Sequence, residues 1–211
     1  NHNLFEISAT HTTASNWGFH GMTFDMNSVN GHAIYSAHAT GSSNQRAEID
    51  NCVFREIAAD YSAINLTDPA FIYGNSLSIR TNGYGIYLGV NSSYSTHYGN
   101  SHFQNTFIAL EANNTVGVQL NASGGYTMNL CSFDHLDIQA LTATIGTKGI
   151  VFWGAQSNSF DWVNLEYLGV GIEMNHDGTL GSYYNVFTNL RIYNAETIGV
   201  DLNNGASRNT F

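Results

Sequence analysis

Gly85-Ile86-Tyr87-Leu88 is the stretch that decides the fold, because the same four-residue pattern returns along the chain. The pattern is glycine, then isoleucine or valine, then any residue, then a large apolar residue. Further copies are Gly117-Val118-Gln119-Leu120, Gly149-Ile150-Val151-Phe152, Gly171-Ile172-Glu173-Met174 and Gly199-Val200-Asp201-Leu202, with looser copies at Ala33-Ile34-Tyr35-Ser36 and Ala63-Ile64-Asn65-Leu66. An element that recurs at about 20–50 residues is typical of a solenoid.

A second pattern alternates with the first: a small polar residue or cysteine (methionine in the first copy), then any residue, then phenylalanine or leucine. Its copies are Met22-Thr23-Phe24, Cys52-Val53-Phe54, Asn75-Ser76-Leu77, Ser101-His102-Phe103, Cys131-Ser132-Phe133, Asn158-Ser159-Phe160, Asn185-Val186-Phe187 and Asn209-Thr210-Phe211. Short runs with a period of two follow several copies, and no window has a long helical period. Each repeat therefore holds two or three very short strands separated by turns.

Strands that recur once per coil and stack in parallel fit these patterns better than hairpins do. The predicted fold is all-β: a right-handed parallel β-helix of about seven to eight coils, with the hand following from the crossover rule. Residues 1–211 are predicted to form a single domain. Because the pattern is already running at both ends, we expect a fragment of a longer helix, open at both ends. Stacked asparagines should hydrogen-bond from coil to coil at Asn158, Asn185 and Asn209.

The composition limits the classes of binding partner that can be expected. Only 10% of the residues are charged, and the net charge is −10 with six lysines and arginines. Nucleic acid and anionic membranes are therefore excluded as expected partners, since both need a basic surface. No stretch is long and apolar enough to span a bilayer. The polar surface must come from Asn, Ser, Thr, Gly and Tyr, which suits hydroxyl-rich glycans and equally suits a turn-rich β architecture.

The chain has two cysteines, Cys52 and Cys131, which could form one disulfide. In the second pattern, however, both occupy the same coil position three coils apart, which places them roughly 14 Å from one another. A disulfide needs Cα atoms within about 7 Å. We therefore expect two reduced, buried cysteines.

The periodicity, together with the opening Gly21-Met22-Thr23-Phe24-Asp25, resembles the pectate-lyase-like β-helix superfamily. Within it, the chain is most similar to the β-helical bodies of bacteriophage tail spikes, which share its low lysine content and abundant Asn, Gly and Tyr. The resemblance implies a polysaccharide partner, a homotrimer, and a location in the virion tail or outside the cell. The paired-Asp and Gly-His-Gly motifs of polygalacturonases are absent from the sequence, and the calcium-carboxylate and catalytic-Arg pattern of pectate lyases finds no match. These two activities are therefore disfavoured.

Two groups of carboxylates are candidates for catalysis. The outward positions of the first pattern form a predicted column of Tyr35, Asn65, Tyr87, Gln119, Val151, Glu173 and Asp201. Glu173 and Asp201 would lie on adjacent coils, as the acid and the base or nucleophile of a glycosidase do. Sixteen acidic residues on a solenoid also produce some adjacent pairs by chance.

The second group follows the phenylalanines, in a predicted column of Asp25, Arg55, Gln104, Asp134, Asp161 and Thr188. Asp134 and Asp161 would be neighbours, with Asp137, His135, Trp162 and Arg191 close by. A general base, a charge-neutralising arginine and a stacking tryptophan suffice for a polysaccharide lyase. Expected substrate-binding residues are Arg191, Trp162, Tyr87, Trp153 and Tyr35, although exposed aromatic residues serve subunit contacts equally well.

No spacing of His or Cys suggests zinc, and no cofactor is expected. A calcium ion held by Asp134, Asp137 and Asp161 is the alternative.

Three functional hypotheses remain open. The first is a viral tail spike or tail fibre that recognises a host cell-surface polysaccharide, with or without depolymerising it. The second is a secreted bacterial polysaccharide lyase or glycoside hydrolase. The third is a structural stalk or adhesin without catalytic activity.

Overall fold

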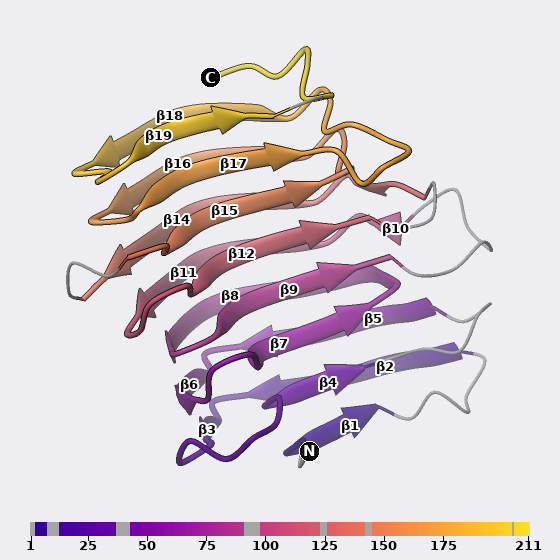
Figure 1. Ribbon diagram of the computed structural model, residues 1–211. Coiled ribbons are helices and arrows are strands. Elements are labelled where there is room, and N and C mark those ends of the chain that lie inside the picture. The colour runs from indigo at the N-terminus through magenta and orange to yellow at the C-terminus, as the bar shows by residue number, and fades with distance from the viewer. Residues whose placement is uncertain are drawn as a thin grey trace.

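The computed structural model describes residues 3–7, 13–36, 43–90, 98–122, 126–141, 145–203 and 205–211; for 13–16, 43–46 and 98–99 it describes the backbone alone. The described chain is all-β and forms two sheets, which we call sheet A and sheet B. Every strand pairing is parallel, as the sequence predicts. Figure 1 shows the strands stacked rung above rung from the N-terminus to the C-terminus.

Sheet A has 8 strands, which pair in chain order along the stack. They are β1 (Phe5–Ile7), β4 (Ile34–Ser36), β7 (Ser62–Thr67), β9 (Tyr84–Gly89), β12 (Val116–Asn121), β15 (Lys148–Trp153), β17 (Val170–Asn175) and β19 (Ile198–Leu202). Sheet B has 11 strands. They are β2 (Thr13–His20), β3 (Thr23–Asp25), β5 (Ser43–Asp50), β6 (Val53–Ile57), β8 (Pro69–Thr81), β10 (Tyr98–Gly99), β11 (His102–Leu110), β13 (Met128–Asn129), β14 (Ser132–Ala140), β16 (Ser159–Glu166) and β18 (Val186–Tyr193).

The result is a parallel β-solenoid of about 6 turns, slightly fewer than the seven to eight coils expected. The last rung is incomplete, since beyond β19 the chain makes only isolated bridges such as Val186 to Thr210. No helix that could span a membrane occurs among the described residues.

The glycine pattern of sheet A has a steric cause. Its apolar anchors pair in register from rung to rung, as Ile86 with Val118 and Val118 with Ile150 show. A Cβ atom built on Gly85 would lie 2.5 Å from the carbonyl oxygen of Gly117, and Gly149 and Gly171 meet the next glycine carbonyl at the same 2.5 Å. Only glycine lets the backbones of adjacent rungs approach this closely.

The core contains a column of stacked phenylalanine rings. Successive centroids from Phe103 through Phe133, Phe160 and Phe187 to Phe211 are 5.1, 4.9, 4.7 and 5.2 Å apart, with planes within 12° of parallel. Beside it, Asn158, Asn185 and Asn209 form the predicted ladder: Asn158 Nδ2 donates to Asn185 Oδ1 at 2.9 Å, and Asn185 Nδ2 donates to Asn209 Oδ1 at 3.1 Å. Both columns lock adjacent rungs into one register.

Sheet B bends at a corner where the backbone is left-handed on successive rungs. The residues at this corner, which we call the corner column, are Gly21 (φ 63°), Asn51 (51°), Ser76 (52°), Asn105 (51°), His135 (53°), Trp162 (52°) and Asn189 (52°). Glycine and asparagine tolerate this conformation. His135 and Trp162 do not favour it, and a bulky residue there carries strain of about 1 kcal/mol.

The predicted register of sheet B is wrong for the first three copies of the second pattern. Leu77 pairs with Thr106 and not with Phe103. Phe54 pairs with Phe24 and with Ile79, so it lies in the column of Ile108 and not in the column of Phe103. Ile49 pairs with Gly74, which pairs with Phe103, so isoleucine holds that position instead. Both columns are inward and apolar, and phenylalanine fits either.

Two expectations change with this register. Asp25 pairs with Arg55, but neither belongs to the column of Gln104, Asp134 and Asp161. Cys131 precedes Ser132, which pairs with Ser159, whereas Cys52 precedes Val53, which pairs with Ser78. The cysteines therefore lie in different columns, and the shared position was wrong, although both cysteines are free and buried as expected.

Candidate functional site

A continuous column of polar side chains runs along the outer face of sheet B, one residue before the corner column. It comprises His20, Asp50, Asn75, Gln104, Asp134, Asp161 and Thr188, each paired in register with the next. We call it the polar column. Strands alternate inward and outward side chains, so the stacked phenylalanines lie one position earlier and face the core.

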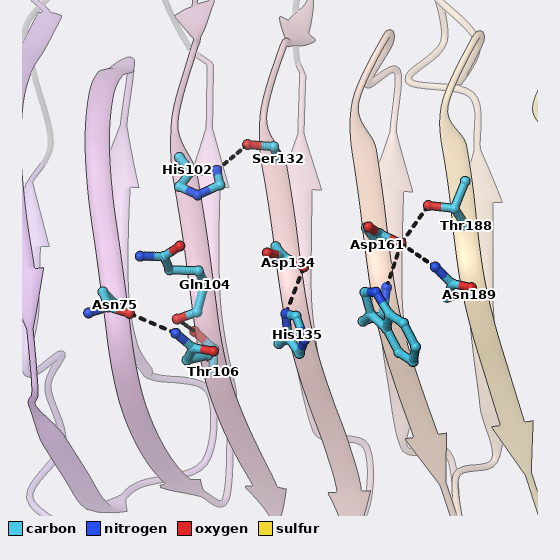
Figure 2. A network of polar contacts seen from close by, with 12 residues as sticks. Asn75, His102, Gln104, Thr106, Ser132, Asp134, His135, Asp161, Thr188 and Asn189 are labelled. Atoms are coloured by element: carbon cyan, nitrogen blue, oxygen red, sulfur yellow. Dashed lines mark hydrogen bonds and ion pairs between the residues drawn. The ribbon is translucent and has the colours of Figure 1, made fainter.

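Hydrogen bonds join some neighbouring rungs of the polar column, as Figure 2 shows for Asp161 and Thr188. Asn75 donates to Asp50 at 2.8 Å, and Asn105 of the corner column donates to Asn75 at 3.0 Å. Gln104 donates to the hydroxyl of Tyr73. These bonds hold amides and carboxylates in fixed orientations on the surface, which lowers the entropy cost of ordering them on a ligand.

The acidic part of the column lies on β14 and β16. Asp134 Oδ1 is 2.8 Å from Nδ1 of His135. Asp161 Oδ1 accepts from Thr188 Oγ1 at 2.7 Å, from Asn189 Nδ2 at 2.9 Å and from its neighbour's backbone N–H. The hydrogen bonds from Thr188 and then Asn189 hold the pKa of the Asp161 carboxyl below its ordinary value. Asp161 therefore stays ionised at neutral pH and is poorly suited to act as a general acid.

His135 and Trp162 form a flat aromatic pair at the corner beside these carboxylates. Their ring centroids are 5.8 Å apart and their planes differ by 11°. Trp162 is 57% exposed, which is unusual for so large an apolar side chain. A strained, exposed aromatic pair contributes little to stability, and outliers of this kind cluster at functional sites.

This arrangement can bind and orient a hydroxyl-rich ligand. A carboxylate has about four lone-pair sites, so Asp161 keeps capacity for outside donors after its three bonds. The flat indole face can pack against a sugar ring. Because Asp134 and Asp161 pair on adjacent strands, their backbones lie about 4.8 Å apart.

Asp137 and Arg191 lie beyond the corner, on the next stretch of sheet B. Asp137 accepts hydrogen bonds from Gln139 and Asn164. Arg191 Nη1 is 3.2 Å from Glu166 Oε1, and its guanidinium lies over the ring of Tyr193. The corner thus separates both residues from Asp134 and Asp161, and the predicted arginine has its own carboxylate partner.

Glu173 and Asp201 are neighbours as expected, but on sheet A. The side chain of Glu173 is only 11% exposed and both its oxygens are bound: Oε2 lies 2.7 Å from Lys148 Nζ, and Oε1 accepts from Asn175 at 2.7 Å. Asp201 accepts a weaker bond from Asn203. A carboxylate held in an ion pair fits a structural part better than proton transfer.

Tyr35, Tyr87 and Trp153 also lie on sheet A. Tyr35 stacks on His32 at 5.0 Å, and the hydroxyl of Tyr87 accepts from Asn121 at 2.6 Å. Trp153 is 38% exposed and lines two shallow hollows of about 350 and 320 Å³. The predicted site residues are therefore divided between sheet A, the polar column and the stretch beyond the corner. Asp134, Asp161 and Trp162 come together on sheet B, and Glu173 and Asp201 are neighbours on sheet A.

The sequence patterns missed a groove at the N-terminal end of the same face as the polar column. It has a volume of about 520 Å³, and its lining includes Gly18, His20, Glu48, Phe71 and Tyr73. Once Ile49 is placed in the core column, Glu48 and Asp50 must point outward. The wrong register of the first rungs hid this arrangement.

No group of three or more His, Cys, Asp or Glu side chains that could hold a metal ion occurs in the part of the chain that the structure describes. Asp137, one of the three expected calcium ligands, is bonded instead to neighbouring amides.

Comparison of the chain with protein-family models, curated proteins and solved structures finds no match.

Proposed function

We propose that this protein is the β-solenoid body of a viral tail spike or tail fibre, and that its polar column binds a polysaccharide on the host cell surface. The observation that carries the proposal is the exposed His135–Trp162 pair beside Asp134 and Asp161. A flat ring flanked by fixed hydrogen-bonding groups is the combination that sugars require, since each ring has apolar faces and hydroxyl edges. The composition agrees, with Asn, Ser, Thr and Tyr replacing charged residues.

The resemblance of the sequence to the β-helical bodies of tail spikes supports a homotrimer located in the virion tail. A free secreted lyase or hydrolase would use the same face. A purely structural stalk has no use for a strained, exposed tryptophan, and the binding test below separates it from the other two.

Cleavage is a second candidate activity, supported by one observation, the in-register carboxylates Asp134 and Asp161. Asp161 would act as the nucleophile or base, because its lowered pKa keeps it ionised. New reducing ends, or the ultraviolet absorbance of an unsaturated sugar, would appear on incubation with bacterial capsule or lipopolysaccharide. If the Asp134→Asn variant turns over at the unchanged rate, the carboxylate pair is not the catalyst.

Binding is tested by electrophoresis of the full chain through gels that contain purified bacterial lipopolysaccharide or capsular polysaccharide. We expect retardation by at least one of these glycans, and a loss of affinity of about tenfold in Trp162→Ala, which corresponds to about 1.4 kcal/mol. Tyr167→Ala is the matched control, because Tyr167 is also exposed and also left-handed (φ 58°) but lies past the end of β16. Equal losses in both variants, or no retardation of the wild type, would refute the proposal.

A further inference from the structure

A groove of about 520 Å³ lies on the same face as the polar column, at its N-terminal end. Gly18, Glu48 and Tyr73 are paired in register on β2, β5 and β8. Gly18 contributes no side chain to this row, and the hollow of about 520 Å³ opens there. Phe71 and Tyr73, which are 55% and 37% exposed, present aromatic rings at its edge.

We propose that this groove is a second subsite, and that it and the Asp134–Trp162 site hold one linear glycan that carries no acidic groups and lies along the solenoid axis. The inference rests on the proposed function and deepens it. The polar column joins the two places without a break, from His20 at the groove to Thr188. Six strand spacings separate its ends, or about 29 Å.

The charge of the face selects the class of glycan. This face carries four carboxylates, those of Glu48, Asp50, Asp134 and Asp161. Among the described residues, three of them are paired with histidines and not with arginine or lysine. His20 lies 3.9 Å from both Glu48 and Asp50, and His135 lies 2.8 Å from Asp134. Four of the described Arg and Lys side chains are paired with carboxylates elsewhere, at Asp25, Glu111, Glu173 and Glu166. A uronic acid or phosphate placed beside these carboxylates would meet like charges. Neutral and amine-bearing sugars meet no such barrier.

The test uses purified bacterial capsular and lipopolysaccharide glycans, immobilised on an array and grouped as neutral, amine-bearing or acidic. We expect the full chain to bind only members of the first two groups. The double variant Glu48→Gln/Asp50→Asn should gain binding to acidic members at low salt. Wild-type binding to acidic glycans as tight as to neutral ones would overturn the charge selection while leaving the proposed function intact.

Chain length tests the second subsite. A bound glycan is cut into fragments of graded size, and the affinity of each is measured by calorimetry. Tyr73 and Trp162 are three strand spacings apart, or about 14 Å along the axis. Tyr73→Ala should weaken fragments long enough to span that distance by about tenfold and leave shorter fragments unchanged. Tyr73→Phe, which keeps the ring but loses the hydroxyl that Gln104 contacts, should stay close to wild type.

Three results of these two tests distinguish a failure of the second subsite from a failure of the proposed function. If Tyr73→Ala binds long fragments as tightly as wild type, the groove is not a subsite, although the Asp134–Trp162 site stands. If Tyr73→Phe loses as much as Tyr73→Ala, Tyr73 acts by positioning Gln104 and does not contact the sugar, which also overturns the subsite. If no glycan of any group binds the wild type, the proposed function itself fails.

Discussion

The imidazole of His135 stacks on the indole of Trp162 across adjacent rungs, with centroids 5.8 Å apart and planes 11° apart. Both residues have left-handed backbones, at a corner where asparagine occupies three of the other rungs. The chain thus places two bulky side chains where small or asparagine side chains cost less. This local conflict is the strongest sign that the corner serves a ligand, because natural sequences depart from local preference mainly at functional sites.

Replacing Trp162 by asparagine should stabilise the fold while it weakens glycan binding. Asparagine tolerates the left-handed conformation, so we expect the free energy of unfolding to rise by about 0.5–1 kcal/mol. Urea denaturation followed by circular dichroism measures the change. Trp153→Asn is the control, because Trp153 lies in a regular strand, β15, and its substitution should destabilise. A larger loss of stability in Trp162→Asn than in Trp153→Asn would contradict the strain argument.

The buried asparagine ladder should be sensitive to loss of polarity. Asn185 is fully buried and donates to Ala155 and Asn209 while it accepts from Asn158. Asn185→Leu would leave several of these groups unpaired, at about 1–3 kcal/mol each, so we expect a loss of roughly 3 kcal/mol. Asn203→Leu removes an exposed asparagine that donates to Asn175 on the neighbouring rung, and it should cost less than about 1 kcal/mol. Equal losses in thermal or urea unfolding would show that the ladder does not stabilise the stack.

The ion pair of Lys148 and Glu173 should behave as a structural unit. Lys148→Met leaves a largely buried carboxylate without its cation, and we expect a loss of about 2 kcal/mol, because Lys148 itself is partly exposed. Adding Glu173→Gln should recover most of that loss in a double-mutant cycle. Additive losses would indicate that the two side chains do not interact, and would reopen a catalytic role for Glu173.

His32 should make the N-terminal rungs sensitive to acid. Burial among Tyr35, Tyr61 and Asn65 lowers the pKa of His32 from 6.5 to about 4, and its Nδ1 accepts the Ser62 N–H. Between those two values the unfolded chain binds more protons than the folded chain. This contribution to stability is therefore complete above pH 6.5 and is lost as the pH falls towards 4.

The measurement is urea unfolding of wild type and His32→Gln at pH 7, 5.5 and 4.5. The wild type should lose more stability over this range than the variant does, whatever their difference at pH 7. Parallel pH profiles would mean that His32 is protonated in the folded chain.

The sequence predicts sheet A well, because one position holds glycine, or alanine on the first rungs, and the next holds a branched apolar residue. On later rungs a carbonyl oxygen 2.5 Å from the Cβ that Gly85 lacks excludes even alanine. The Asn158–Asn185–Asn209 ladder is also predictable from the sequence, because a buried side-chain amide needs hydrogen-bond partners on the neighbouring rungs.

Sheet B is predicted less well, because each rung has several inward apolar positions, such as Phe133, Leu136 and Ile138. Phe54 and Phe103 look alike in sequence, yet they occupy different columns. That ambiguity placed Asp25 and Arg55 in the wrong column, and it concealed Asp50, Asn75 and the groove around Gly18.

The corner column has no sequence signature of its own. Asn51 and Asn105 suit a left-handed backbone, but Ser76, His135 and Trp162 give no hint of it. The conformation of these three residues is imposed by the rungs on either side, so it is a property of the stack and not of the local sequence.

The most direct test of the account is the structure of the full chain with a bound oligosaccharide, prepared from whichever cell-surface glycan it retains. We predict a sugar ring against Trp162 and His135, with hydroxyl groups within hydrogen-bond distance of Asp134 or Asp161. A sugar bound on sheet A against Trp153, with the polar column unoccupied, would contradict the central claim.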